Sequence, residues 1–469
     1  MSLQITPATR LEDIYRTLEP DPLVKADELA AFYAVEINEV RGGDKMQRIA
    51  LRLNRAHGDR RYFKACVMGH RGVGKSTEIS QLLTQIDQKF QPLRFSAVSV
   101  LDPGSFKPLD VLLVMIIDVV EQTDQPVAKG GAGQRPSDRR LQELWDWFST
   151  TKVTKEEGRN SMITAEGGAG VKEDSLWEKI LGLFVNLKGE MKFASSRKAE
   201  VVEYQLSQLK DLIEIANRLL DECNDLLEKA TGKQWLFIGE DFDRAGIPTS
   251  RIEDLFITYA NIFQNLRSHL VFTLPIGLFY SAKATQLPFA QDCSFVIPDT
   301  PMFTQDHDPN MAGRNAVKKA LSARMDLQLC EPDQLERLMV ASGGNLRDLF
   351  GLINYAADGA MLRGASQINA ADADGAIINL RSDYERRLGQ SPYDVDVISY
   401  DDKVKLLKRI YDGEKEAQMT NPVLYSLLNA RSVQEFNGQR WFGVHPLVVD
   451  ILVGQKHLNK GVAGGTVLC

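Results

Sequence analysis

The sequence predicts an α/β protein built on a parallel sheet, and three observations support this prediction. The apolar run Ala65–Met68 leads into the glycine-rich stretch Gly69–Thr77, and a helical pattern follows directly. Two further short apolar runs, Trp235–Gly239 and Leu270–Pro275, have the composition of buried strands. Helical patterns separate these runs, and strands that alternate with helices form parallel βαβ units.

The length of the chain predicts several domains. A chain of 469 residues is too long for one compact domain, and roughly two to four are expected. We expect an N-terminal helical segment over residues 1–60, an α/β core over 61–300 with an insertion at about 125–194, a helical lid over 301–392 and a small C-terminal domain over 393–469.

Composition limits the function classes. Hydrophobic residues make up 43% of the chain and charged residues 25%, as in ordinary globular proteins. The net charge of −7 argues against a surface coated with basic residues for nucleic acid. The five cysteines lack C-x-x-C spacing, which favours reduced thiols over disulfides or zinc ligands. No signal peptide is read at the N-terminus, and the longest apolar run, Val111–Val120, is too short to span a bilayer. We therefore expect a cytoplasmic protein without a membrane partner.

The other elements follow in order from the same periodicities. Residues 1–60 contain helical patterns at Ala26–Val40 and Lys45–His57, for which packing on the core is the default expectation. The expected elements of the core are a strand over Tyr62–Met68, a helix over Glu78–Phe90, a strand over Arg94–Val100, a helix over Leu109–Glu121 and a fifth strand over Ser294–Pro298. The expected lid helices are Gly313–Arg324, Pro332–Ser342, Leu346–Leu362 and Ala370–Leu388.

The stretch that starts at Gly69 reads G-x-x-x-x-G-K-S between a strand and a helix. Glycines let backbone N–H groups close around a phosphate, and the first N–H groups of the following helix point at the same anion. Lys75 would then reach the β- and γ-phosphates of ATP, and the Ser76 hydroxyl would bind Mg²⁺. A chance match occurs in about one chain of this length in fifty, and the strand and helix around the motif make it rarer. The residues expected to bind the nucleotide are Gly69, His70, Arg71, Gly72, Val73, Gly74, Lys75, Ser76 and Thr77.

Two more glycine runs, Gly130–Gly133 and Gly167–Gly170, lie in the expected insertion. Neither is followed by Lys-Ser or Lys-Thr, so we interpret both as linkers rather than phosphate loops. A long amphipathic pattern, Ser195–Ala230, then predicts one helix that leads to the next strand.

Two adjacent acids, Glu240 and Asp241, stand at the end of the predicted strand Trp235–Gly239. Carboxylates at the end of a buried strand are costly unless they serve an ion or a proton. We assign Glu240 to Mg²⁺ and Asp241 to the polarisation of the attacking water. The alternative is an acidic turn that caps the next helix.

Two further residues are candidates for sensing the nucleotide. Thr273 near the end of its strand could position the attacking water, although a Thr in a strand is also a good β-former. Arg347 follows the small-residue turn Ser342–Asn345 in the first turn of a helix, from which it could reach a γ-phosphate. The alternative for Arg347 is a surface arginine paired with a neighbouring acid or with solvent.

Together these motifs resemble those of AAA+/STAND-type P-loop ATPases. The resemblance spans about residues 45–390 and is closest to origin-recognition-like and bacterial STAND-like members, while Asp243-Arg244 resembles the KAP-type branch. It implies an ATPase with ATP and Mg²⁺ as cofactors, with Thr273 as the sensor-1 residue and Arg347 as the sensor-2 residue.

The sequence departs from this family pattern in two places. Glu240 stands where such families usually carry Asp. No arginine lies between the sensor-1 strand and the fifth strand, where the trans-acting arginine finger is usual, and Arg244, Arg267 or Arg314 could replace it. Slow or partner-stimulated hydrolysis is therefore expected.

The C-terminal part predicts a winged-helix-like domain. Helices at Asp401–Tyr411 and Asn421–Asn429 precede strands at Ser432–Phe436 and Arg440–Val444, and Asn437-Gly438 is a strong hairpin turn. A last helix begins at His445-Pro446. Basic and acidic residues are nearly balanced here, which favours protein contact or autoinhibitory packing over DNA.

Two functions are consistent with these features. The first is an ATP-binding and ATP-hydrolysing molecular switch that forms a homo-oligomer or engages a protein effector, and the STAND resemblance implies bacterial signalling or anti-phage defence. The second is a DNA-binding ATPase, such as a replication initiator or a transposition or transcription regulator. A degenerate nucleotide-binding scaffold is disfavoured by the intact set Lys75, Ser76, Glu240 and Asp241.

Overall fold

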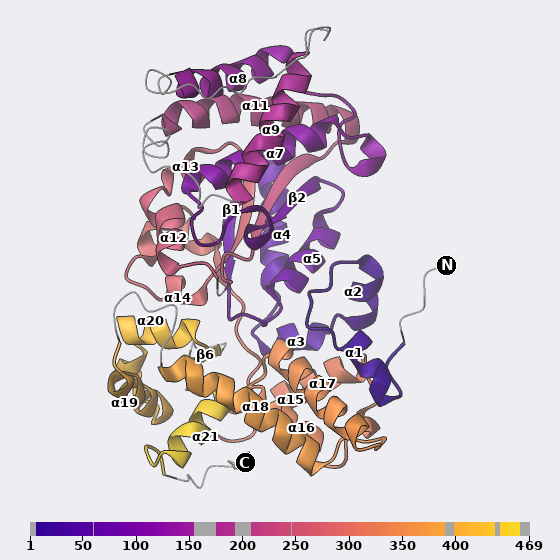
Figure 1. The fold of residues 1–469 in the computed structure, drawn as a ribbon, viewed down its shortest axis with the longest axis vertical. Helices are drawn as coiled ribbons and strands as arrows, with labels where there is room; N and C mark the ends of the chain where they lie inside the picture. The colour runs from indigo at the N-terminus through magenta and orange to yellow at the C-terminus, as the bar shows by residue number, and fades with distance from the viewer. Residues whose placement is uncertain are drawn as a thin grey trace.

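The computed structural model describes residues 6–59, 61–153, 175–192, 208–244, 246–389, 398–436 and 441–459. Its centre is a five-stranded parallel sheet in the order β2-β3-β4-β1-β5 (Figure 1). The strands are β1 Lys64–Met68, β2 Phe90–Ser96, β3 Gln234–Glu240, β4 His269–Leu274 and β5 Ser294–Val296. The predicted α/β fold class with a parallel-sheet core is confirmed.

Two layers of helices cover the sheet. On one face, α4 (Lys45–Gly58) and α5 (Lys75–Ile86) bury their apolar sides against β1, β3 and β4. On the other face lie α7 (Pro108–Asp124) and α11 (Leu209–Thr231), packed against the opposite side chains of the same strands. A sheet buried on both faces explains why its inner strands β1, β3 and β4 read as largely continuous apolar runs.

The second strand differs from its predicted range of Arg94–Val100. β2 already ends at Ser96, and residues Ala97–Val100 form the short helix α6. The last paired residues of β2 and β3 are Ser96 and Glu240, so no neighbouring strand is available beyond Ser96. The pattern of β-branched residues alone could not reveal where this partner strand stops.

The predicted insertion adds helices to the outer side of this layer. Helices α8 (Asp138–Val153) and α9 (Leu176–Lys192) lie with α7 and α11 at the top of Figure 1 and share their apolar core. The first glycine run forms a turn that folds back on α7, because Ala132 N donates to the carbonyl of Thr123. The run Gly167–Gly170 and the start of the predicted helix Ser195–Ala230 lie outside the described residues.

The helices of the lower half in Figure 1 include the expected lid. They are α15 Met311–Ser322, α16 Gln334–Ala341, α17 Leu346–Leu362 and α18 Ala370–Gly389. The N-terminal segment contributes η1 Leu11–Asp13, α1 Ile14–Thr17, α2 Ala26–Phe32 and α3 Val35–Val40. Residues of η1, α1 and α3 share one apolar core with the lid, so this segment packs on the lid as well as on the sheet domain.

The C-terminal elements appear in the predicted order. They are α19 Tyr400–Tyr411, the short η8 Lys415–Gln418, α20 Pro422–Asn429, the antiparallel hairpin β6 Val433–Phe436 and β7 Trp441–Val444, and α21 Pro446–Gly454. The turn residues Asn437 and Gly438 lie outside the described part of the chain. These elements share the apolar core of the lid, and their assignment as a winged helix stays a prediction.

His445 fastens the C-terminal domain to the lid. Its buried ring stacks on Tyr384 at 4.1 Å between centroids. Its Nδ1 accepts from Leu447 N at 3.2 Å, and its Nε2 lies 3.3 Å from the carbonyl oxygen of Ser342. Burial lowers the pKa of His445 to about 4, so the ring is neutral at pH 7.

This histidine predicts acid sensitivity. The pKa of His445 in the folded protein lies below the ordinary value of 6.5. Its contribution to the free energy of unfolding is therefore complete above pH 6.5 and is lost as the pH falls towards 4. We expect a loss of about 2 kcal/mol of unfolding free energy at pH 5 from this residue. Denaturant unfolding at pH 7.5 and pH 5 measures it, with His445→Gln as the comparison. If the unfolding free energy fell equally between pH 7.5 and pH 5 in the wild type and in His445→Gln, His445 would not be the source of the acid sensitivity.

Among the described residues, no helix is both long and apolar enough to cross a bilayer.

Candidate functional site

The glycine-rich loop lies between β1 and α5, where the lid touches it. Helix α5 begins at Lys75, three residues earlier than predicted, because Gly74 caps it in the left-handed region at φ 101°. Gly72 has φ 88°, and a Cβ atom there would lie 2.5 Å from Asn345 Oδ1 and 2.7 Å from Arg347 Cβ. The lid therefore approaches the loop at a position that only glycine can occupy.

A cavity of about 830 Å³ opens beside this loop. Ligand pockets commonly measure about 300–1,000 Å³, so the cavity has the size of a small-molecule site. It is lined by the loop, by the ends of β2, β3 and β4, by the N-terminal segment and by the lid. The predicted site residues in its lining are Arg71, Gly72, Val73, Gly74, Lys75, Ser76, Thr77, Glu240, Asp241, Thr273 and Arg347.

Two predicted residues do not line the cavity. Gly69 and His70 lie at the start of the loop but outside the cavity lining, and their carbonyl oxygens accept from Lys75 Nζ at 2.8 and 3.0 Å. The His70 ring is buried 2.7 Å from Asp299. Burial alone would raise the pKa of Asp299, but His70 and Arg41 beside it hold the pKa below its usual value. His70 thus holds the loop in place rather than facing a ligand.

Lys75 makes an ion pair inside the cavity. Its Nζ lies 2.7 Å from Asp243 Oδ2, and both side chains are nearly buried. Asp243 follows the predicted acidic pair in a turn after β3, and sequence reasoning did not assign it a role in the site. Its sequence signals were the string of acids after the strand and the resemblance of Asp243-Arg244 to the KAP-type branch.

Glu240 stands at the end of β3 with one oxygen free among the described residues. Its Oε2 pairs with Arg94 of β2, while its Oε1 is buried without a hydrogen-bond partner in that part of the chain. Arg94 also donates to the Ser76 carbonyl at 3.2 Å, so it links Glu240 to the start of α5. Arg94 is a second residue that sequence reasoning missed.

The free oxygen of Glu240 and the Ser76 hydroxyl suit Mg²⁺, which prefers oxygen ligands. No cluster of three or more His, Cys, Asp or Glu ligands occurs within the described ranges. A metal at this place would therefore take most of its ligands from phosphate and water, as Mg²⁺ does in phosphoryl-transfer sites.

Asp241 is held in one orientation by several contacts. Its backbone is left-handed at φ 65°, an uncommon conformation for a non-glycine residue. Its carboxylate accepts from Ser96 Oγ at 2.5 Å and from Arg244 Nε at 2.6 Å. Burial would raise its pKa, but these two donors outweigh burial, and the pKa lies below its ordinary value. Asp241 is therefore ionised at neutral pH.

Thr273 lies beside Asp241 rather than alone in its strand. Its Oγ1 accepts from the backbone N–H of Asp241 at 3.1 Å. The buried hydroxyl thus helps to hold the uncommon backbone conformation of Asp241. This contact gives Thr273 a role that strand propensity alone does not explain.

Arg347 brings an incompletely paired positive charge to the cavity. Its Nη1 is buried without a hydrogen-bond partner among the residues described. Burial lowers the pKa of Arg347, and the neighbouring charges of Arg71 and Arg244 lower it further. Several guanidinium groups crowded together with a donor to spare favour an anionic ligand.

The N-terminal segment forms one wall of the cavity. Nothing in its sequence predicted this role. Leu23 N donates to Thr77 Oγ1 at 3.1 Å, and the buried Arg41 donates to the Val73 carbonyl at 3.0 Å. The buried Glu78 of α5 accepts from Tyr33 at 2.8 Å. The segment is thus part of the site rather than a separate packing element.

Of the three candidate arginine fingers, only Arg244 lines the cavity. Arg267 pairs with Asp221 at 2.7 Å, and Arg314 pairs with Glu336. Within this chain, those two arginines are engaged elsewhere.

Comparison with known proteins gives a likeness in fold only. No protein-family model matches the chain, and no curated protein matches its sequence. Among solved structures, Cdc6p of Pyrobaculum aerophilum is 11% identical, with 95% of this chain and 99% of that chain covered at a TM-score of 0.39. The ADP form of the ORC2 protein of Aeropyrum pernix is 13% identical, with 95% and 99% covered at 0.35. A Walker-type ATPase of Pyrococcus abyssi is 12% identical, with 93% and 99% covered at 0.36. Superpositions this loose leave the function to be inferred from the site itself.

Proposed function

We propose that this chain is an ATP-binding and ATP-hydrolysing molecular switch, whose lid and C-terminal domain respond to the bound nucleotide. In this proposal the loop Arg71–Thr77 binds the phosphates, and Arg347 contacts the terminal phosphate from the lid. The cavity beside the loop and the free donor of Arg347 support a phosphate ligand.

One carbonyl group carries the proposal of a switch rather than a simple ATPase. The Arg71 carbonyl oxygen, in the loop, accepts from Asn345 Nδ2 of the lid at 3.0 Å. It also accepts from Arg431 Nη1 of the C-terminal domain at 3.2 Å. A change in the loop on nucleotide binding would therefore reach both domains through a single atom.

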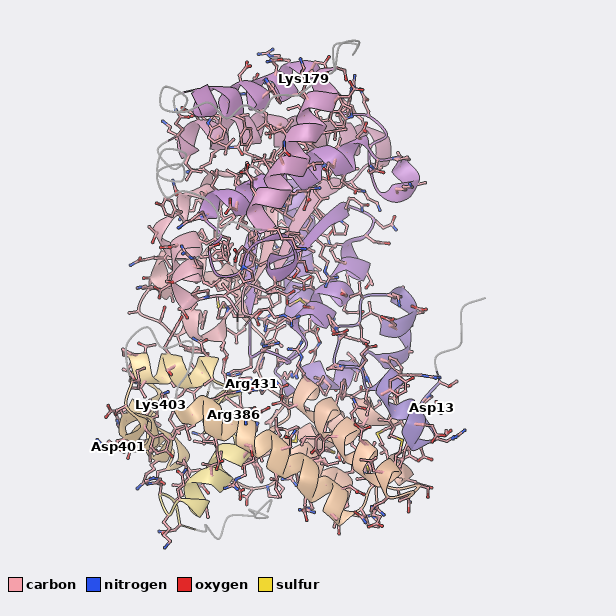
Figure 2. All side chains as sticks on the ribbon, in the orientation of Figure 1. Asp13, Lys179, Arg386, Asp401, Lys403 and Arg431 are labelled. Atoms are coloured by element: carbon pink, nitrogen blue, oxygen red, sulfur yellow. The ribbon has the colours of Figure 1, made fainter. Side chains whose placement is uncertain are left out.

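Arg431 strengthens this connection. The same Nη1 lies 3.1 Å from Asp348 Oδ1 of the lid, and the other oxygen of Asp348 accepts from Tyr384 at 2.9 Å. Figure 2 places Arg431 near the middle of the molecule, between the sheet-containing part and the lower helices. The buried guanidinium of Arg431 therefore connects the loop, the lid and the C-terminal domain through charge-assisted hydrogen bonds.

The residues at the strand ends would perform the hydrolysis. Asp241, ionised and held by Ser96 and Arg244, would accept a proton from the attacking water. Glu240 and Ser76 would hold Mg²⁺, which neutralises charge that develops on the phosphates. Arg244 or Arg347 would stabilise that charge from the protein side.

Replacing Arg431 with alanine tests the switch. Without nucleotide, we expect faster amide hydrogen exchange in α19–α21 than in the wild type. We expect no further change when ATP is added, because the variant lacks the hydrogen bond from Arg431 to the loop. A loss of about 3 kcal/mol in stability is also expected, since Asp348 loses its buried partner. The control is Arg386→Ala, which removes an exposed arginine. Exchange that responds to ATP as in the wild type would contradict the switch.

The cellular setting is a further part of the proposal. The STAND-like resemblance implies bacterial signalling or anti-phage defence, with a second copy of the chain or a protein effector as partner. The alternative, a DNA-binding ATPase, predicts ATP-responsive DNA binding with a steep salt dependence. Measuring particle size and DNA binding with and without MgATP separates the two: assembly without DNA supports the switch, and salt-sensitive DNA binding supports the alternative.

A further inference from the structure

The ion pair between Lys75 and Asp243 uses the last free donor of the lysine. An ammonium group has three N–H donors. Nζ of Lys75 has three acceptors, the carbonyl oxygens of Gly69 and His70 at 2.8 and 3.0 Å and Asp243 Oδ2 at 2.7 Å. A phosphate can therefore bind this ammonium group only by replacing one of the three.

Asp243 is the acceptor that can exchange. The two carbonyl groups belong to the backbone at the start of the loop, and the His70 ring is held by the buried Asp299 at 2.7 Å. The Asp243 carboxylate instead sits on a rotatable side chain in the turn after β3, and it lines the cavity. Rotation of this one side chain frees Lys75 without moving the backbone.

The released carboxylate would not be left without positive charge nearby. Asp243 interacts electrostatically with Arg244 and with Arg347, which line the same cavity. A carboxylate that moves from the lysine towards these guanidinium groups keeps a favourable environment. The exchange of partners therefore avoids a buried, unpaired charge.

We propose that Asp243 is a built-in competitor of the nucleotide: its carboxylate occupies the place of a phosphate on Lys75 and sets the affinity of the site. This inference rests on the proposed nucleotide binding and adds to it the residue that opposes binding. It also assigns Asp243 a role different from those of Glu240 and Asp241.

The test is the affinity for MgATP of variants at position 243. Asp243→Asn leaves a neutral and weaker acceptor, and Asp243→Ala leaves none, so both are expected to bind MgATP about tenfold more tightly. Asp243→Glu keeps the competing charge and is expected to stay near the wild-type affinity. Titration calorimetry with MgATP measures all four proteins, and thermal unfolding checks that each variant is folded.

A matched control separates this effect from a change in net charge. Asp292→Asn removes an acid that is 68% exposed in an ion pair with Arg52, and it is expected to leave the affinity unchanged. Unchanged or weaker binding by both Asp243→Asn and Asp243→Ala would overturn the competitor role and make Asp243 a group that positions Lys75. The absence of MgATP binding in the wild type and in Asp243→Asn alike would instead overturn the proposed function.

Discussion

Lys75→Ala is expected to lower the affinity for MgATP by about a hundredfold or more. Lys75 is the buried cation of the loop, and the loss of one partner from a buried charge pair costs about 2–5 kcal/mol. The substitution removes the charge that the β- and γ-phosphates would contact. Titration calorimetry with MgATP measures the change.

The control for this variant is Lys89→Ala, which removes an exposed lysine just after α5. Lys75→Ala also leaves Asp243 without its ion-pair partner, so its thermal unfolding must be recorded alongside. A folded Lys75→Ala protein that binds MgATP as the wild type does would refute the assignment of the loop.

Asp241→Asn is expected to slow ATP hydrolysis by about 10²–10⁴-fold while ATP still binds. The amide keeps the size of the side chain, but it cannot take a proton from water. Because the pKa of Asp241 lies below its ordinary value, protonation of this base should not lower the wild-type rate above about pH 5. Single-turnover hydrolysis and retention of labelled ATP after gel filtration measure the two effects.

The control for this second variant is Asp254→Asn, which changes a half-exposed acid in the segment between β3 and β4. Glu240→Gln should behave differently from Asp241→Asn, with a higher Mg²⁺ requirement. Hydrolysis by Asp241→Asn at the wild-type rate would remove Asp241 from the mechanism.

Local patterns were sufficient for the core of the fold. Strand β1, the loop and the start of α5 are contiguous in sequence, so a short-range signal contains all of their geometry. The acids Glu240 and Asp241 were found because a buried strand with acids at its end is unusual by itself. The ends of elements were less predictable, as the early stop of β2 at Ser96 shows.

Residues whose role depends on a distant partner could not be found in this way. Arg94 lies in an ordinary amphipathic strand, and only the β2–β3 register brings it to Glu240. Arg431 lies 360 positions from the loop carbonyl that it contacts. Charged residues of this kind are common on surfaces, so nothing in their local sequence distinguishes a buried joint from a solvated side chain.

The sequence by itself determined that the chain has a parallel α/β core with a phosphate-loop motif, since both depend on neighbouring residues and on hydrophobic periodicity. Only the tertiary structure decided what surrounds that loop. It placed the N-terminal segment and the lid around one cavity, it brought Arg431 to the loop carbonyl of Arg71, and it paired Lys75 with Asp243. Contacts between segments that are far apart in the chain follow from packing as a whole, and no local pattern encodes them.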